Sequence, residues 1–520
     1  MVSSKREIVP GDCVLVTGAA GGVGSHVVKA LIDAGCEVKA VDLRPMTHAG
    51  LDEEIDEDSV EWIEADLTKT DLRALVKGCD AVIHAAALVG LSEKYDDMVE
   101  VNVDLVHELL EASEAEGVRH FIHFSTGAIY RPGRGLLGEE AAIEPSSDYA
   151  ETKLDAEAAF TSDLKLNWTI LRPALLYGPR CESMSAGLFT LPPILRNFMP
   201  LMPGFTGGAR SNWCHADDAA SAALFVLGNP KAYSRVFNVA DDTPMGSGEV
   251  ITAITEAYGL PIGPLVPFPN STVLLAFSPV MDRDYLERTL RTVLRQIWKR
   301  VVSRHELETP LRPKVDRGAL FYVAEDTVLD AGALKELGWD PAWPSFRDGV
   351  VDTLRWYQDQ GWAPKFDAEQ RDREDTSFGF AVSQTLSGKW VLPSTGESRP
   401  AQVSLEAEFP NIVKADFHGR INGMAWIEGL AQNVAIEGTA KVEIFSGRNL
   451  TYEFAFVSDE GVAHRCRVEA TFNPFRVFSS MSNLNGTMVN AQGEKVGNVE
   501  FSLGFADQLV PMLMSFRPLT

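Results

Sequence analysis

The stretch of sequence that decides the fold is Val14-Leu15-Val16-Thr17-Gly18-Ala19-Ala20-Gly21-Gly22-Val23-Gly24. A short apolar run, which predicts a buried strand, leads into spaced glycines and then into a helical pattern. Gly18 permits a tight turn, Gly21 lets the backbone approach a pyrophosphate, and Gly24 allows a helix to pack closely on the strand. The amino end of that helix presents free N–H groups to phosphates. The stretch therefore predicts a dinucleotide-binding turn.

Short apolar runs and helical patterns alternate along the chain after this turn. Apolar runs at 37–41, 81–84, 121–124, 168–171 and 236–239 predict strands, and the patterns at 23–34, 72–77 and 97–116 predict helices. Strands that alternate with helices of this length form β-α-β units with parallel strands. The predicted fold class is α/β, a Rossmann-type doubly wound parallel sheet with a smaller substrate-binding lobe.

Asp42 ends the second predicted strand, about 24 residues after Gly18. A carboxylate at this place can accept hydrogen bonds from both ribose hydroxyls of an adenosine. It also repels a 2′-phosphate, so NAD is favoured over NADP as the cofactor. Arg44 lies close by and is able to neutralise such a phosphate, which keeps NADP as the alternative.

The composition limits the kind of protein. The chain has 520 residues, of which 45% are hydrophobic and 23% charged, as in a folded globular protein of about three domains. With 47 Lys and Arg against 73 Asp and Glu, the formal net charge is -26, so nucleic acid is not an expected partner. No apolar run reaches the length of about 18 residues that a membrane-spanning helix needs, and the polar start shows no signal core.

The six cysteines are spread along the chain, at 13, 36, 79, 181, 214 and 466. None is in CxxC spacing or near a histidine at the spacing of zinc ligands, so no metal site is expected. They are too few for a disulfide scaffold in a chain of this size. Reduced thiols and a cytoplasmic location are therefore expected.

The composition changes after a charged run at Lys365–Thr376, which predicts a linker. Strand-like segments follow at 387–392, 403–409, 441–444, 450–457, 464–472 and 495–505, with no helical pattern of comparable length. Residues 377–520 are therefore predicted to form a separate all-β domain, a barrel or a sandwich. A small barrel can hold one apolar ligand, but a role in packing or assembly is the somewhat stronger expectation.

Several further motifs lie between residues 12 and 362. They are Ala65-Asp66-Leu67, His84-Ala85-Ala86-Ala87, Phe124-Ser125-Thr126-Gly127-Ala128-Ile129-Tyr130, Tyr149-Ala150-Glu151-Thr152-Lys153, Leu171-Arg172-Pro173 with Tyr177-Gly178-Pro179, His215-Ala216-Asp217-Asp218-Ala219 and Leu337-Gly338-Trp339. Together with the Gly-x-x-Gly-x-x-Gly spacing, they resemble the extended branch of the short-chain dehydrogenase/reductase superfamily, the NAD-dependent epimerase/dehydratase family. The resemblance does not extend to residues 377–520.

The resemblance implies NAD as cofactor and a set of residues that bind it. The implied set is Gly18, Ala20, Gly21, Gly22, Val23, Gly24, Asp42, Arg44, Asp66, Leu67, His84, Ala85, Ala86, Tyr149, Lys153 and Pro173. Asp66 corresponds to the acidic residue that meets the adenine, and Pro173 lies in the loop over the nicotinamide. For Asn102 the resemblance implies support of the active-site helix or a proton relay, although a plain polar helix residue is an equal alternative.

The catalytic group is predicted around Tyr149 and Lys153, which are four residues apart and so share a face of a helix. The lysine ammonium favours the phenolate form of the tyrosine, which gives a base able to take a proton from an alcohol. The resemblance assigns Lys153 a second task, holding the nicotinamide ribose. It assigns Thr126 to hold the substrate oxygen, with Ser125 as the neighbouring candidate.

The substrate lobe is expected mainly at 181–205 and 261–330. Residues 188–195 and 198–203 are strongly apolar, which favours a hydrophobic alcohol or ketone. A nucleotide-sugar diphosphate needs cations, and only Arg180, Arg196 and Arg210 are near in sequence. These segments also resemble the 3β-hydroxysteroid dehydrogenase-like group. The preferred function is therefore NAD-dependent oxidation or reduction of a steroid-like or other lipidic secondary alcohol or ketone.

Two other functions stay open. A nucleotide-sugar epimerase or dehydratase is the first, although dehydratases of the family usually carry Asp-Glu where this chain has Gly127-Ala128. A non-catalytic NAD-binding sensor or scaffold is the second, and the intact Thr126, Tyr149 and Lys153 argue against it.

A basic amphipathic helix is predicted at 283–305. Its apolar stripe is Leu286, Leu290, Leu294, Ile297 and Val301, and its basic stripe is Arg288, Arg291, Arg295 and Lys299. Such a helix can lie on a membrane surface, as the resemblance also implies, or pack its apolar face on the core of its own chain. A homodimer is the expected assembly.

Overall fold

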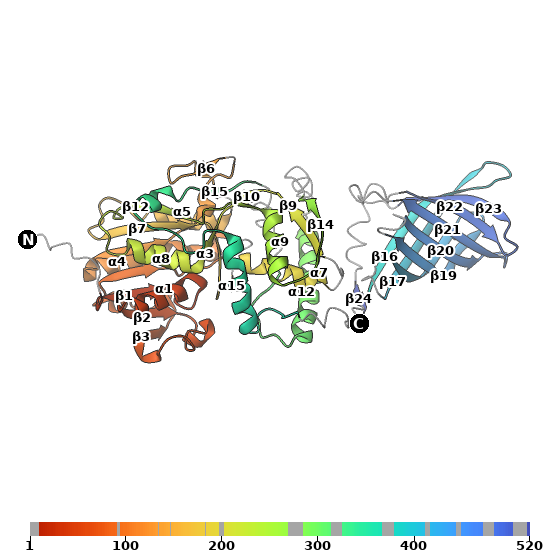
Figure 1. The fold of residues 1–520 in the computed structure, drawn as a ribbon. Helices are drawn as coiled ribbons and strands as arrows, with labels where there is room; N and C mark the ends of the chain where they lie inside the picture. The colour runs from red at the N-terminus through yellow and green to blue at the C-terminus, as the bar shows by residue number, and fades with distance from the viewer. Residues whose placement is uncertain are drawn as a thin grey trace, which may run out of the picture. The chain divides into compact units, whose positions relative to one another are not determined.

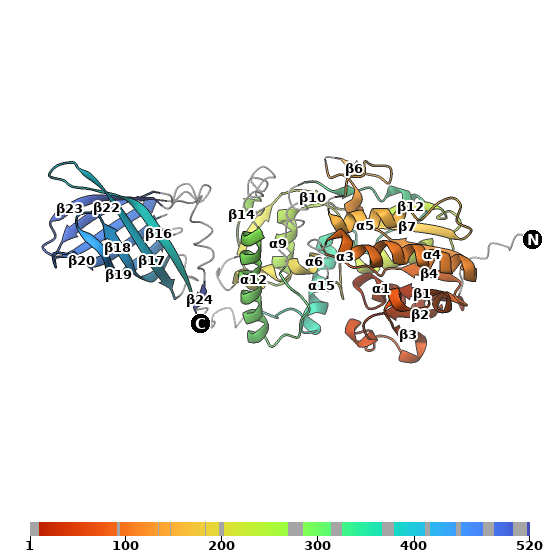
Figure 2. The same ribbon diagram turned by 180° about the vertical axis from the view of Figure 1, so that it is seen from behind.

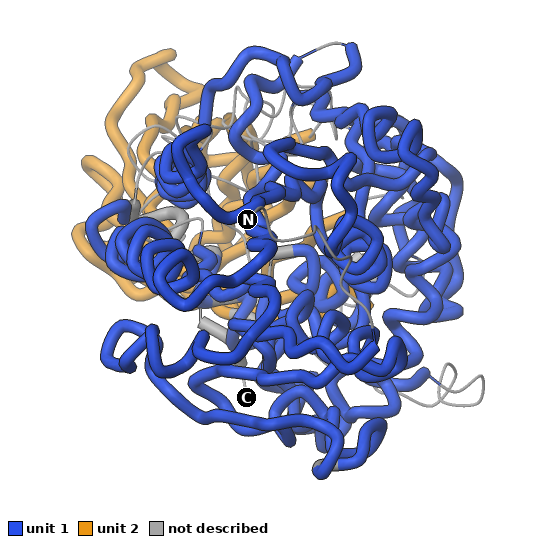
Figure 3. The backbone as a smooth tube through the Cα atoms, turned by 90° about the vertical axis from the view of Figure 1, so that its left-hand side faces the viewer, with its two compact units in different colours: residues 1–193, 202–366 blue, residues 194–201, 367–520 orange. Residues whose placement is uncertain are grey.

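The structure is a computed structural model. It describes residues 10–90, 94–133, 135–145, 147–182, 184–196, 202–268, 284–313, 325–366, 379–410, 416–443, 449–471, 483–502 and 517–519. The chain divides into two compact units, coloured separately in Figure 3: unit 1 is Met1–Pro193 with Met202–Phe366, and unit 2 is Ile194–Leu201 with Asp367–Thr520. All of the predicted linker beyond Phe366 lies outside the described residues.

Unit 1 is built on a seven-stranded parallel sheet in the order β12-β7-β5-β4-β1-β2-β3. The strands are β1 (Cys13–Thr17), β2 (Glu37–Asp42), β3 (Val60–Glu64), β4 (Ala81–His84), β5 (His120–Phe124), β7 (Asn167–Pro173) and β12 (Arg235–Val239). This confirms the predicted Rossmann-type sheet. The order changes direction at the neighbouring strands β1 and β4, and the carboxyl ends of strands at such a switch point form a binding crevice.

Helices cover both faces of this sheet (Figures 1 and 2). One face carries α1 (Gly22–Asp33) and α8 (Ala216–Val226), and the other carries α2 (Leu72–Val76), α4 (Leu105–Glu116) and part of α5 (Asp148–Glu157). Within β1, Val14 and Val16 belong to the first buried layer and Leu15 to the second. Because both faces are buried, the strands are nearly continuous apolar runs.

The other helices and strands up to Phe366 lie mainly after β7. They are α3 (Tyr95–Val99), β6 (Leu136–Leu137), β8 (Leu175–Tyr177), α6 (Met184–Leu188), α7 (Leu191–Arg196), β9 (Met202–Thr206), β10 (Arg210–Ser211), β11 (Trp213–His215), β13 (Met245–Gly246), α9 (Ser247–Ala257), β14 (Ile262–Pro267), α12 (Asp284–Arg304), β15 (Val328–Leu329), α14 (Gly332–Glu336) and α15 (Phe346–Asp359). Parts of the expected substrate lobe, at 197–201, 269–283 and 314–324, lie outside the described residues.

The predicted amphipathic helix is confirmed as α12. In its second half Ile297, Trp298 and Val301 are buried, and the Trp298 indole N–H donates to the Leu311 carbonyl at 2.7 Å. Arg295 and Lys299 are exposed. This half of the apolar stripe is therefore covered by the chain itself. Within the described part of the chain, no helix has the length and apolarity that crossing a membrane requires.

Unit 2 contains antiparallel strands that follow one another in chain order, and β16 pairs with both β17 and β23, which closes them into a barrel. The strands are β16 (Gly379–Val391), β17 (Ser398–Phe409), β18 (Asp416–Ile427), β19 (Ala431–Glu443), β20 (Asn449–Val457), β21 (Ala463–Thr471), β22 (Asn483–Asn490) and β23 (Lys495–Ser502). A short strand, β24 (Arg517–Leu519), pairs with the start of β16. The predicted all-β class is confirmed.

The inside of this barrel is filled by side chains. Residues alternate between buried and exposed along the strands, most regularly in β21, and inward residues such as Leu386 and Phe454 are at most 1% exposed. At Gly438 and Gly486 a Cβ would lie within 2.0 Å of a carbonyl oxygen of the neighbouring strand. Glycine therefore lets the strands approach and bend there, as closure of a barrel requires. The described strands enclose a packed core.

Candidate cofactor and active site

The glycine turn between β1 and α1 leaves no room for side chains at two positions. Gly18 has φ of 69°, and a Cβ there would lie 2.7 Å from the backbone of Ala86 in the loop after β4. A Cβ on Gly24 would lie 2.0 Å from the Gly18 carbonyl oxygen. The turn, the helix and the loop after β4 are thus packed against one another by backbone contact, as the motif predicts.

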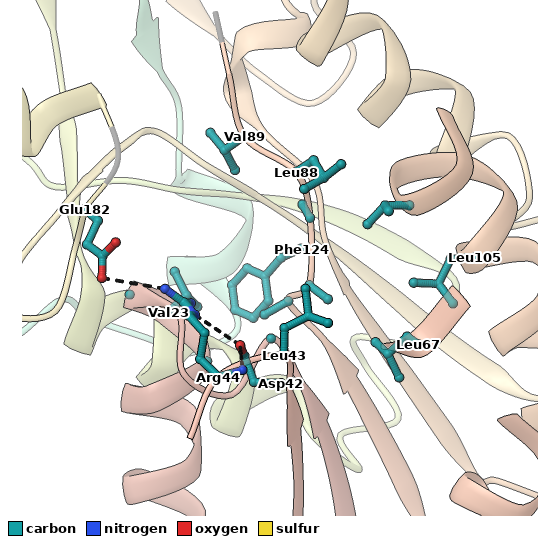
Figure 4. A pocket seen from close by; sticks show the side chains of 18 of the residues that line it. Val23, Asp42, Leu43, Arg44, Leu67, Leu88, Val89, Leu105, Phe124 and Glu182 are labelled. Carbon is teal, nitrogen blue, oxygen red and sulfur yellow. Dashed lines mark hydrogen bonds and ion pairs between the residues drawn. The ribbon is translucent and has the colours of Figure 1, made fainter. Parts of the chain in front are cut away.

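A cavity of about 560 Å³ lies over this turn, at the carboxyl ends of the central strands (Figure 4). Its size falls in the range of cofactor sites. It is lined by Gly18, Gly21, Gly22, Val23, Gly24, Asp42, Leu43, Arg44, Ala65, Asp66, Leu67, Thr68, Ala85, Ala86, Ala87, Leu88, Val89, Val101, Leu105, Phe124, Ser125, Tyr149, Lys153, Pro173, Leu176, Arg180, Cys181 and Glu182. All the predicted cofactor residues except Ala20 and His84 are among them.

Ala20 and His84 do not line this cavity, and each has a hydrogen bond to a neighbouring side chain. The Ala20 N–H donates to Asp42 Oδ2 at 3.0 Å, so it fixes the carboxylate. The His84 ring is fully buried, with Nδ1 2.8 Å from Thr17 Oγ1. Burial, together with the positive charge of Lys153, lowers the pKa of His84 to about 3, so the ring is neutral. His84 therefore supports the end of β1.

Two carboxylates are fixed in the cavity wall, at and just after the ends of β2 and β3. Asp42 Oδ1 accepts from the Arg44 backbone N–H at 3.0 Å and from Arg44 Nε at 3.1 Å. Asp66 accepts from the N–H and hydroxyl of Thr68, and Lys69 Nζ donates to it at 2.6 Å. These hydrogen bonds fix the orientation of each carboxylate. Both side chains lie in the cavity wall, which also includes the apolar side chain of Leu67.

Helix α5 brings Tyr149 and Lys153 to the same cavity, as their spacing predicts. The Ser147 hydroxyl caps the helix by accepting from the Ala150 N–H at 3.2 Å. Lys153 is 2% exposed. Burial lowers the pKa of Lys153 to about 7, against the opposing effect of the Glu157 carboxylate one turn further on. The protonation of Lys153, which supplies the positive charge beside Tyr149, therefore changes near neutral pH.

A second, smaller cavity of about 110 Å³ shares Tyr149, Ser125 and Pro173 with the first. Thr126 lies only in this second cavity and accepts from the Ala128 N–H at 3.1 Å, so its own hydroxyl proton is available to a substrate oxygen. The Ser125 hydroxyl instead donates to Glu157. Of the two predicted candidates, Thr126 is the one whose donor is not already used among the described residues.

Asn102 supports the active-site helix, the first of the roles considered for it. It lies in a π-helical turn, η4 (Glu100–Asp104), and is 1% exposed. Its side chain exchanges hydrogen bonds with the backbone of Leu88, at 2.8 and 3.0 Å, and donates to Thr152 Oγ1 at 3.0 Å. Single π-helical turns often occur at functional sites. Asn102 thus ties the loop after β4 to the helix that carries Tyr149.

A buried ion pair behind Lys153 was not predicted. Arg172 Nε donates to Glu157 Oε1 at 2.9 Å, and both side chains are less than 10% exposed. Arg172 also donates to the Tyr130 hydroxyl at 2.7 Å, and that hydroxyl donates to Asn238 at 2.8 Å. In the sequence, the spacing of Lys153 and Glu157 already indicates that the two side chains lie one helical turn apart on the same face. The partner Arg172 has no such local signal.

The Asp42 carboxylate is expected to decide the choice of cofactor. In Asp42→Ala the repulsion of a 2′-phosphate falls, and the Arg44 guanidinium loses one of its partners. The preference for NAD over NADP in kcat/KM should therefore drop by about fivefold or more, since a nearby charge pair at a protein surface is worth about 1 kcal/mol or more. Equal efficiency with both cofactors in the unmutated protein would contradict the assignment.

Lys153 should make the stability of unit 1 depend on pH. Its pKa is about 7 in the folded chain against about 10.5 when unfolded, so the unfolded state binds the extra proton between these values. The free energy of unfolding should therefore rise with pH through this window, by up to about 1.4 kcal/mol per pH unit. Urea unfolding at pH 7, 8 and 9 should show a smaller slope in Lys153→Met. The control Lys29→Met, at a partly exposed site, should keep the slope of the unmutated protein.

The comparisons with known proteins agree with this site. Residues 14–240 match the model of the NAD dependent epimerase/dehydratase family. The UDP-glucose 4-epimerase of Mycolicibacterium smegmatis is 29% identical over 268 residues, which cover 48% of this chain and 84% of that one. The 3 beta-hydroxysteroid dehydrogenase/Delta 5-->4-isomerase of Mycobacterium tuberculosis is 26% identical over 265 residues, 47% of this chain and 69% of that one.

A solved structure supports the fold. The UDP-glucuronic acid 4-epimerase from Bacillus cereus, in complex with NAD, matches with a TM-score of 0.50 at 21% identity, over 67% of this chain and 99% of that one. The glycine turn, the acid after β2 and the Tyr149–Lys153 pair all lie in or near the matched residues. Residues 14–240 therefore belong to the NAD dependent epimerase/dehydratase family, and the cofactor of this site is NAD.

Proposed function

We propose that this protein is an NAD-dependent oxidoreductase that acts on a hydrophobic secondary alcohol or ketone, steroid-like or otherwise lipidic. The observation that carries the proposal is the lining of the second cavity. Its apolar side chains are Val89, Ala128, Pro173, Ala174, Leu175, Leu176 and Leu329, and its polar ones, apart from Tyr149, are Ser125, Thr126, Ser185, Ser211, Asn212 and Thr327. No charged side chain is among the described lining residues.

Arg180, one of the three arginines considered for a diphosphate, is already engaged by groups of its own chain. Arg180 is 4% exposed, and its Nε donates to the Ala49 carbonyl at 2.7 Å. The same guanidinium pairs with Glu54 and lies 5.4 Å from the centre of the Trp356 ring. Arg210 is exposed and is not a lining residue. These positions favour a substrate without a diphosphate.

The side chains around the second cavity suit proton transfer at a carbinol. The Tyr149 phenolate takes the hydroxyl proton, Lys153 stabilises that phenolate through its positive charge, and the Thr126 hydroxyl donates to the substrate oxygen. NAD held in the first cavity would supply the hydride acceptor for the carbinol carbon. The apolar wall excludes water and holds the hydrocarbon part of the substrate.

A nucleotide-sugar epimerase is the second candidate, and the similarity to the UDP-glucose 4-epimerase of Mycolicibacterium smegmatis favours it. A panel of hydroxysteroids and UDP-sugars with NAD separates the two functions. We expect net NADH absorbance with a hydroxysteroid and no conversion of the sugars. Conversion of a UDP-sugar without net NADH, followed by chromatography of the products, would contradict the proposal.

Membrane contact through 283–305, a homodimer and a cytoplasmic location stay predictions. Exposed Arg295 and Lys299 support contact with an anionic surface, whereas the burial of Ile297 and Val301 leaves less apolar area for insertion.

Unit 2 is expected to act in packing or assembly, since the interior of its described strands is filled. A chain that ends after Phe366 should therefore lose activity on a water-soluble alcohol and on a hydrophobic alcohol by the same factor, or keep full activity on both. Selective loss on the hydrophobic alcohol, measured as kcat/KM, would instead indicate that the barrel delivers the substrate.

A further inference from the structure

The chain that follows β8 returns to the glycine turn. A Cβ on Gly22 would lie 2.8 Å from Cys181 Sγ and 3.1 Å from the Cys181 Cα, so this segment lies directly against the start of α1. Glu182, the next residue, lines the cofactor cavity, and Figure 4 shows its carboxylate directed toward Arg44. A residue far away in sequence thereby reaches the adenosine side of the site.

Buried contacts hold this segment in place. Arg180 has φ of 62°, a left-handed backbone conformation that is unfavourable for a residue with a Cβ. Its guanidinium is anchored by Ala49 and Glu54, and the Tyr357 hydroxyl donates to the Cys181 carbonyl at 2.7 Å. Strained backbone kept by such anchors is typical of functional positions. Glu182 is therefore presented from a fixed point.

Arg44 lies between two carboxylates. Its Nε is 3.1 Å from Asp42 Oδ1, and its Nη1 is 3.6 Å from Glu182 Oε1 (Figure 4). His48 Nε2 lies 2.8 Å from the same glutamate oxygen and 2.8 Å from Arg44 Nη1. The Arg44 guanidinium is thus held between two carboxylates at this corner of the cavity. Arg44 is therefore not free to serve an added phosphate.

We propose that Glu182 is a specificity-determining residue, which makes the site prefer NAD over NADP by engaging Arg44. A guanidinium binds a phosphate best through two parallel hydrogen bonds, so Arg44 would have to leave its carboxylate partners to hold a 2′-phosphate. The role differs from that of Asp42, which would accept from the ribose hydroxyls of bound NAD, and it does not depend on which substrate the enzyme uses.

The test is a titration of the full chain carrying Glu182→Gln with NADH and with NADPH, followed by nucleotide fluorescence. The substitution keeps the side chain's size and removes its charge. We expect NADPH to bind more tightly while NADH changes little, so that the ratio of the two dissociation constants shifts about tenfold toward NADPH, or about 1.4 kcal/mol. The shift should shrink at high salt, because exposed charges are screened.

Two further variants decide whether Arg44 carries the effect. Glu140→Gln, which removes an exposed carboxylate outside the cavity, should leave the ratio unchanged. Arg44→Ala combined with Glu182→Gln should show no gain over Arg44→Ala alone, because the two residues act as a pair. The proposal is overturned if Glu182→Gln leaves the ratio as in the unmutated protein, or if the gain persists without Arg44.

Discussion

Turnover of Tyr149→Phe should fall by about 10²–10⁴-fold, while the dissociation constant for NAD changes by less than about twofold. The substitution keeps the ring and removes the hydroxyl that takes the substrate proton, and general acid–base catalysis contributes about this factor. Tyr149 lines both the cofactor cavity and the second cavity, so it lies between the cofactor site and the proposed substrate site. Steady-state kinetics and a separate NAD titration measure the two quantities.

A matched substitution checks that the loss is chemical. Tyr95→Phe also removes one phenolic hydroxyl. That hydroxyl, on α3, donates at 2.7 Å to Asp155 on α5, the helix that carries Tyr149. Tyr95 does not line either cavity. Its turnover should stay within a few-fold of the unmutated protein. A loss below tenfold in Tyr149→Phe would show that another group takes the proton.

Much of the fold could be predicted because the decisive segments are locally unambiguous. The strands of the parallel sheet are buried on both faces and so read as apolar runs, and Gly18 and Gly24 occupy positions where a Cβ cannot fit. In contrast, β22 was not predicted. Its eight residues include three asparagines and a glycine, and only Leu484 and Met488 are fully buried, so its alternation is weak.

The predicted cofactor residues lie together at one cavity where a local motif positions them, and the prediction was incomplete where distant segments meet. The loop after β4 lines the cavity with Ala85 and Ala86, whereas the preceding His84 ends the strand and points into the interior. Glu182 reaches Arg44 only because the segment after β8 folds back over the glycine turn. A single motif predicts neither the direction of a side chain nor the packing of a distant segment, such as the one after β8, against the glycine turn.

The pair of Glu157 and Arg172 shows the same limit, and it leads to the largest expected effect on stability. Glu157 accepts from Arg172 and from Ser125, and its charge raises the pKa of the neighbouring Lys153. In Glu157→Gln the Arg172 guanidinium stays buried without its counter-charge. Breaking a buried pair in this way costs about 3–5 kcal/mol, which denaturant unfolding followed by fluorescence would measure.

A double substitution separates the charge from the packing. Glu157→Gln with Arg172→Met removes both charges and should recover a substantial part of the lost stability, because an unpaired buried charge costs more than a missing ion pair. The activity should not recover with it. Without Glu157 the pKa of Lys153 falls further below about 7, so less of the lysine is protonated at neutral pH to favour the Tyr149 phenolate. Full activity in the stable double variant would show that the ion pair only holds the fold and does not tune the catalytic lysine.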